Sequence, residues 1–128
     1  AAVNVVSQAA YAEFLASGSG PPADCVSSTD VAACWGELLY TRNGCIGCHA
    51  NDGERQQPGP NWKGLFGQER PLEGGGSVTA DENYIREAIM QPQAAIVQGY
   101  STLNMPPYNL SDDEVAAIIA YMQALDAQ

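Results

Sequence analysis

A run of five residues near the middle of the chain has the types and spacing needed to hold a large flat cofactor. Cys45-Ile46-Gly47-Cys48-His49 is the C-x-x-C-H pattern of covalent haem attachment. Its two thiols can reach two vinyl groups on one edge of a porphyrin, and the histidine that follows can turn its imidazole onto the iron. We therefore predict one covalently bound c-type haem, held by Cys45, Cys48 and His49.

Three other chemistries use a C-x-x-C pair: a redox dithiol, half of a zinc site and a disulfide. A redox dithiol normally sits in a βαβ context, and no such pattern precedes Cys45. A zinc site needs further cysteine or histidine ligands in suitable groups, and His49 is the only histidine of the chain. The two observations favour haem over the redox dithiol and over the zinc site.

The second axial ligand of the iron is expected to be one of three methionines, because the chain has no second histidine. Met90 and Met122 fall in expected helices, where methionine is more often an adaptable core filler than a ligand. Met105 precedes Pro106 and Pro107, which stiffen its loop, so we predict Met105 as the ligand. Histidine–methionine ligation fills both axial positions and raises the reduction potential. It favours electron transfer over the alternative, a haem peroxidase or small-ligand sensor with a labile sixth ligand.

The elements that must position these residues are predicted to be mostly helices. Asp30 can cap a helix that ends near Asn43-Gly44, directly before the haem motif. Apolar residues recur in it at helical spacing. They are Val31, Cys34, Trp35, Leu38 and Leu39.

Two capping-box patterns predict two further helices. The first box runs from Thr79 to Glu82, and its helix should stop before Pro92. The second runs from Ser111 to Glu114. The expected inward residues are Tyr84, Ile85, Ala88 and Ile89 in the first helix, and Val115, Ile118, Ile119, Met122 and Leu125 in the second.

Long loops and a small β-hairpin near residues 69–79 complete the expected fold, which we assign to the all-α class. Leu65 and Phe66 are the predicted buried anchors of the loop between Asn51 and Gly67. Loops of this length are uncommon in a plain helical bundle. A cofactor that fills the core would explain them.

Residues 1–29 are predicted to be an N-terminal extension, and residues 30–128 the haem domain. Val3 to Leu15 could form a short helix, and Ser17 to Pro22 is a linker candidate. Because the apolar start lacks the basic residues of a signal peptide, we expect a mature or trimmed form.

Composition limits the kinds of partner. The chain has 128 residues, a net charge of −10 and only five basic residues. It therefore lacks the basic surface that nucleic acid binding requires. An acidic surface favours basic partner patches. No apolar run is long enough to span a membrane, so we expect contact with a membrane only through a missing anchor or a partner complex.

From Trp35 to Leu125 the sequence resembles class I cytochrome c. The resemblance rests on Gly36-Glu37-Leu38-Leu39-Tyr40, the haem motif, Gly59-Pro60-Asn61, Met105-Pro106-Pro107 and Tyr121. Within that family the chain is most similar to the cytochrome c domain of subunit II of caa-type haem–copper oxidases. This similarity rests on Gly59 to Gly67, Val78 to Ile85 and Gly99-Tyr100. It implies the class I fold around one haem and electron delivery to an oxidase or another acceptor.

The resemblance also implies roles for single residues near the haem. Pro60 would offer its carbonyl to the ring N–H of His49, which fixes the ring and raises its basicity. Trp62, Tyr100 and Tyr108 could pack against the haem or bind a propionate through a ring N–H or hydroxyl.

Two further expectations follow from the resemblance. Gly36 would let the first core helix cross the last one closely, near Tyr121. Bacteria attach c-type haem outside the cytoplasm, so the expected location is the periplasm or the outer face of the cytoplasmic membrane. That compartment permits disulfides, and we expect a Cys25–Cys34 bridge, with two buried free thiols as the alternative.

Overall fold

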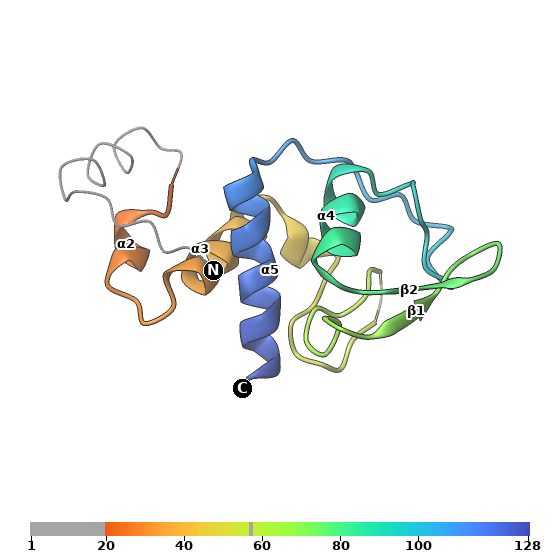
Figure 1. The fold of residues 1–128 in the computed structure, drawn as a ribbon, viewed down its shortest axis with the longest axis horizontal. Helices are drawn as coiled ribbons and strands as arrows, with labels where there is room; N and C mark the ends of the chain where they lie inside the picture. The colour runs from red at the N-terminus through yellow and green to blue at the C-terminus, as the bar shows by residue number, and fades with distance from the viewer. Residues whose placement is uncertain (1–19, 57) are drawn as a thin grey trace.

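The structure, a computed structural model, describes residues 20–56 and 58–128. The predicted helix at Val3 to Leu15 and the first half of the Ser17 to Pro22 linker, residues 17–19, lie outside the described residues. The elements, in chain order, are α2 (Ala23–Val26), α3 (Val31–Arg42), the 3₁₀ turn η1 (Cys45–Gly47), β1 (Glu69–Pro71), β2 (Ser77–Thr79), α4 (Glu82–Met90) and α5 (Asp112–Asp126) (Figure 1).

Helix α3 begins and ends at the predicted residues. The side chain of Asp30 accepts a hydrogen bond from the amide of Ala33 at 3.0 Å, as an N-cap does. At the other end, Asn43 is the C-cap, and Gly44 follows with a φ of 76°. This left-handed conformation is available to glycine at little cost, and it turns the chain from α3 directly into η1.

Only one of the two predicted capping boxes is correct. At α5, the Ser111 side chain accepts from the Glu114 amide, and the Glu114 carboxylate accepts from the Ser111 amide. At α4, the prediction of Thr79 as N-cap is wrong, because Asp81 caps the helix by accepting from the Tyr84 amide at 2.9 Å. Thr79 instead ends β2, and its hydroxyl donates to the carboxylate of Glu69, its pairing partner on β1. Helix α4 ends before Pro92, as predicted.

Helices α3 and α5 cross in close contact near the centre of the molecule (Figure 1). Gly36 lies at the crossing, where an added Cβ would come within 2.0 Å of the Ala117 carbonyl oxygen and 2.7 Å of the Tyr121 Cβ. The predicted role of Gly36 as the residue that permits this crossing is confirmed.

The predicted inward face of α5 forms the core. Its buried members include Val115, Ile118, Ile119, Met122 and Leu125. From α4, Ile85 and Ile89 are buried, while Tyr84 and Ala88 are half-buried. Leu65 is buried as predicted, and Phe66 is half-buried against the same core.

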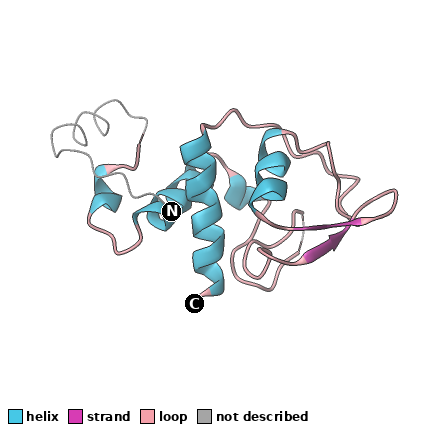
Figure 2. Cartoon of the chain, in the orientation of Figure 1, coloured by secondary structure: helices cyan, strands magenta, loops and turns pink. Residues whose placement is uncertain are grey.

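Strands β1 and β2 form the predicted small hairpin, antiparallel and with Glu69 opposite Thr79. Loops and this hairpin make up most of the side of the molecule away from α2 and α3 (Figure 2). The expectation of helices, long loops and one small hairpin is therefore confirmed.

Cys25 and Cys34 form a disulfide that ties α2 to the first turns of α3, with a Cα–Cα distance of 5.6 Å. Cys25 is completely buried. Within residues 20–56 and 58–128, no helix has the length and apolar character needed to cross a membrane.

Candidate haem-binding site

The two thiols of the haem motif are held by the 3₁₀ turn η1. The amide of Cys48 donates to the Cys45 carbonyl at 3.1 Å, and the amide of His49 donates to the same oxygen at 2.9 Å. Both thiols are free; Cys45 is buried and Cys48 is exposed. Burial raises the pKa of the Cys45 thiol above its ordinary value, so this group is protonated at neutral pH. The turn thus brings Cys45, Cys48 and His49 to one cavity.

The ring of His49 is oriented by the carbonyl of Pro60. Nδ1 lies 2.8 Å from this oxygen and donates its proton to it, because a carbonyl can only accept. The lone pair of a neutral imidazole then lies on Nε2, the atom left free to bind a metal. Burial lowers the pKa of His49, and the hydrogen bond to Pro60 only partly offsets this effect. The imidazole is therefore neutral at neutral pH, as a metal ligand must be.

Two neighbours confine His49 further. A Cβ on Gly59 would lie 2.7 Å from His49 Cε1 and 3.0 Å from the Cys48 carbonyl oxygen, so only glycine fits against the ring. The hydroxyl of Tyr40 donates to the His49 carbonyl. Burial, together with the nearby Tyr121 hydroxyl, raises the pKa of Tyr40 to about 12, so the phenol keeps its proton.

The buried Asn61 fixes the loop that presents the preceding proline carbonyl. Its side-chain oxygen accepts from the amides of Gly53 and Lys63 at 3.0 and 2.9 Å. Its side-chain nitrogen donates to the Asp52 carboxylate at 2.6 Å and to the Arg55 carbonyl at 2.9 Å. In the sequence, Asn61 stands out only as the last residue of the Gly59-Pro60-Asn61 motif, and its hydrogen-bonding role was not predicted. Its position in a loop rich in Gly and Pro was the available signal.

The cavity beside His49 has walls from η1, α4 and the long loop that joins α4 to α5. Most of the wall is apolar, as a porphyrin plane requires. The aliphatic side chains in it are Leu65, Ile85, Ala88, Ile89, Ala95, Ile96, Val97 and Leu103.

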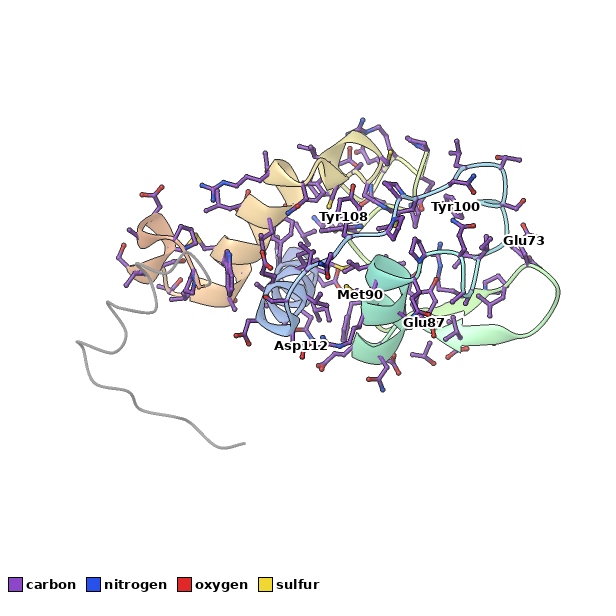
Figure 3. All side chains as sticks on the ribbon, turned by 90° about the horizontal axis from the view of Figure 1, so that it is seen from above. Glu73, Glu87, Met90, Tyr100, Tyr108 and Asp112 are labelled. Atoms are coloured by element: carbon purple, nitrogen blue, oxygen red, sulfur yellow. A yellow bond between two sulfur atoms is a disulfide. The ribbon has the colours of Figure 1, made fainter. Side chains whose placement is uncertain are left out.

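Of the three methionines, Met105 and Met122 line this cavity. Met122 has only 2% of its surface exposed and packs in the core on α5. Met105 is half-buried on the loop. Met90 is not part of the wall; it lies on α4 and packs against the core (Figure 3). The structure therefore brings Met105 and His49 to the same cavity, and iron ligation by Met105 stays a prediction.

Trp62, Tyr100 and Tyr108 all line the cavity. Trp62 is 4% exposed, and the centroid of its ring system lies 5.6 Å from that of the His49 ring. The two tyrosine hydroxyls donate to backbone carbonyls elsewhere in the chain. Trp62 thus packs beside the predicted iron ligand, whereas the tyrosines contact the protein itself.

Arg70 places a cationic group in the same wall. Its Nε is buried and has no hydrogen-bond partner among the described residues, although Nη1 donates to Gln68 at 3.4 Å. A buried donor without an acceptor is costly, and a haem propionate would supply that acceptor. Arg70 is not among the site residues predicted from the sequence. Its status as one of only five basic residues in an acidic chain was the one hint.

Two thiols beside a neutral imidazole, an apolar cavity and a guanidinium whose Nε lacks an acceptor together fit a covalently attached haem, so the site defines a c-type haem protein. The sequence model of the cytochrome c family matches residues 35–126, and the chain belongs to that family. Membership implies covalent c-type haem and haem-based electron transfer. The predicted resemblance to class I cytochrome c is confirmed.

The chain is also similar to a subunit of an oxidase. It is 33% identical over 114 residues to cytochrome c oxidase subunit 2 of Alkalihalophilus pseudofirmus. The alignment covers 88% of this chain but only 31% of that protein. The predicted relation to oxidase subunit II is thus confirmed at the level of sequence.

Proposed function

We propose that this chain transfers single electrons through one covalent c-type haem with His49 and Met105 as its axial ligands. The observation that carries the proposal is the hydrogen bond from His49 Nδ1 to the Pro60 carbonyl, which leaves Nε2 free beside the cavity that Met105 also lines. When bound, the haem supplies an iron that gains or loses one electron without making or breaking a bond. In this view the chain is an electron-transfer protein or domain and not an enzyme.

The residues around the cavity make the site rigid and exclude water from it. Tyr40 restrains the backbone of His49, and Gly59 and Pro60 restrain its ring. The hydrogen bond to the Pro60 carbonyl makes Nε2 a more basic ligand. Because these contacts are fixed and the walls are apolar, little in the protein would have to move when the charge of the site changes.

A terminal oxidase is the proposed acceptor, and a redox protein the proposed donor. The 33% identity to an oxidase subunit supports this choice. The chain would act as a domain of such a subunit or as a free carrier, exported to the periplasm or the outer face of the cytoplasmic membrane. The proposed acceptor is tested by measuring steady-state oxidation of the reduced protein by a purified caa-type oxidase. No turnover above that of a haem-free control would contradict the acceptor.

The ligand set is tested by the ferric spectrum of protein produced in a haem-attaching host. Wild type should show a weak absorption band at the red edge of the visible spectrum, which marks a bond between methionine sulfur and ferric iron. Met105→Ala should lose the band and lower the reduction potential, and Met90→Ala should leave both unchanged. A band that survives in Met105→Ala would assign the ligand to another methionine. A pyridine haemochrome assay should give one haem per chain.

A further inference from the structure

The segment that carries Met105 is held at its two ends only. Among the described residues, 101–107 form no hydrogen bond through backbone or side chain. The residues on either side, Tyr100 and Tyr108, each form a backbone and a side-chain hydrogen bond. Whatever restrains Met105 beyond the stiffness of its two prolines must therefore act through these two tyrosines and through packing.

The backbone amide of each tyrosine is hydrogen-bonded on the side of the cavity that carries the Met105 segment. The Tyr100 amide donates to the Val97 carbonyl at 3.1 Å, and the Tyr108 amide donates to the Ile89 carbonyl at 3.3 Å. The stretch before Tyr100 is bound to the hairpin, since the Gln98 amide donates to the Pro71 carbonyl at 2.9 Å. The backbone on both sides of the Met105 segment is thus anchored to α4 and the hairpin.

The two hydroxyls reach in the other direction, to the part of the chain that carries the haem motif. Tyr108 donates to the Asn43 carbonyl at 3.1 Å, and Tyr100 donates to the Gln56 carbonyl at 2.8 Å. Asn43 lies just before Cys45, and Gln56 lies in the loop after His49. Figure 3 labels both tyrosines on the loop between α4 and α5. The two hydrogen bonds therefore join the Met105 side to the His49 side of the cavity.

We propose that Tyr100 and Tyr108 form a clamp: they are positioning residues whose hydroxyl hydrogen bonds hold the Met105 segment closed over the cavity and so set how readily Met105 can be displaced. The proposal rests on the proposed ligation by Met105. Opening the segment far enough to release the sulfur breaks these hydroxyl bonds, because they are what joins its ends to the opposite side. A phenol has one O–H to donate, and here it is given to a backbone carbonyl and is not free for a propionate.

Displacement of the sixth ligand by imidazole in the ferric holoprotein measures this opening directly. The variants are Tyr100→Phe, Tyr108→Phe and the double variant, each of which removes hydroxyls and keeps the rings. Tyr121→Phe is the matched control: it removes a hydroxyl that accepts a hydrogen bond from the Asn51 side chain at 2.8 Å, and Tyr121 is not part of the cavity wall.

Each of the two clamp variants should bind imidazole about fivefold more tightly than wild type, the factor that corresponds to one neutral hydrogen bond. The double variant should show roughly the product of the two factors, and Tyr121→Phe should match wild type. Wild-type affinity in Tyr100→Phe and Tyr108→Phe, with the methionine band intact, would overturn the clamp and leave the proposed function standing. A band that is absent from wild type, or retained in Met105→Ala, would instead overturn the ligation on which the clamp rests.

Discussion

The imidazole of His49 lies directly against the backbone of Gly59. A Cβ at position 59 would come within 2.7 Å of His49 Cε1 and 2.8 Å of Nδ1, the atom bonded to the Pro60 carbonyl. Two neighbouring residues of one loop thus fix the ring, one by a hydrogen bond and one by leaving room for it. The position of the predicted iron ligand therefore depends on a glycine that makes no bond to the haem.

Replacing Gly59 by Ala should disturb His49 more than any other part of the fold. The methyl group cannot be accommodated unless the ring or the Cys48 carbonyl moves, and overpacking of this kind costs about 1–3 kcal/mol. We expect a lower yield of holoprotein, measured by pyridine haemochrome, and a lower midpoint of thermal unfolding. Gly47→Ala is the control, because a Cβ there meets nothing within 4 Å. Equal haem yield in the two variants would contradict this role of Gly59.

Asp52 should make the stability of the protein depend on acid pH. Its carboxylate accepts from the amides of Glu54 and Arg55 and from the side chain of Asn61. These bonds hold the pKa of Asp52 well below its ordinary value. Since the folded-state pKa is depressed, the stabilisation is present above the unfolded pKa of about 3.9 and is lost as the pH falls below it.

Denaturant unfolding of Asp52→Asn at pH 7 and at pH 3 tests this dependence. The variant should be less stable than wild type at pH 7, and the difference should shrink at pH 3. The neighbouring Glu54→Gln is the control, because the Glu54 side chain makes no hydrogen bond among the described residues. A deficit that is the same at both pH values would show that the charge of Asp52 is not the cause.

The start of α4 shows where local sequence signals stop being sufficient. Thr79 and Glu82 have the spacing of a capping box, as Ser111 and Glu114 do, but only the second pair forms one. Thr79 is taken up by pairing with Glu69, ten positions earlier, so the helix starts later, after Asp81. A pattern of four residues cannot report that competition, because strand pairing depends on a partner outside it.

The residues of the site also divide into those that local sequence patterns reveal and those that they do not. Cys45, Cys48 and His49 could be found from spacing, because the chemistry of attachment fixes their order along the chain. Asn61 and Arg70 could not, since their importance comes from burial and from the partners that the fold brings to them or withholds. The hydroxyl partners of the two clamp tyrosines are also distant in sequence, at separations of 44 and 65 residues.

Gly36→Ala should lower the free energy of unfolding, whereas helix propensity alone predicts that it rises. In an exposed helix this change stabilises by about 1 kcal/mol. At the α3–α5 crossing, however, the new Cβ would lie 2.0 Å from the Ala117 carbonyl oxygen, which belongs to rigid backbone. We expect the free energy of unfolding to fall by more than about 3 kcal/mol, or the holoprotein not to accumulate. Urea unfolding followed by tryptophan fluorescence measures it. Unchanged or increased stability would mean that the two helices do not cross this closely.

The Cys25–Cys34 bridge should stabilise the fold through α2 and α3. It closes a short loop, with a sequence separation of nine, and removing a bridge of this size costs about 2–3 kcal/mol. The double variant Cys25→Ser/Cys34→Ser should therefore unfold at lower urea concentration while its haem spectrum stays unchanged, because both residues lie outside the haem cavity wall.

Alkylation of the denatured holoprotein, read by mass spectrometry, tests the bridge independently of stability. Cys25 and Cys34 should take up label only after reduction. The haem-motif cysteines should take up none in either case, because their sulfurs are bound in thioethers, and they serve as the internal control for complete maturation. Labelling of Cys25 and Cys34 without reductant would show two free thiols. In that case Cys25, which is fully buried, would hold α2 against α3 by packing alone, and the serine variant would lose stability through the burial of a hydroxyl and not through the loss of a crosslink.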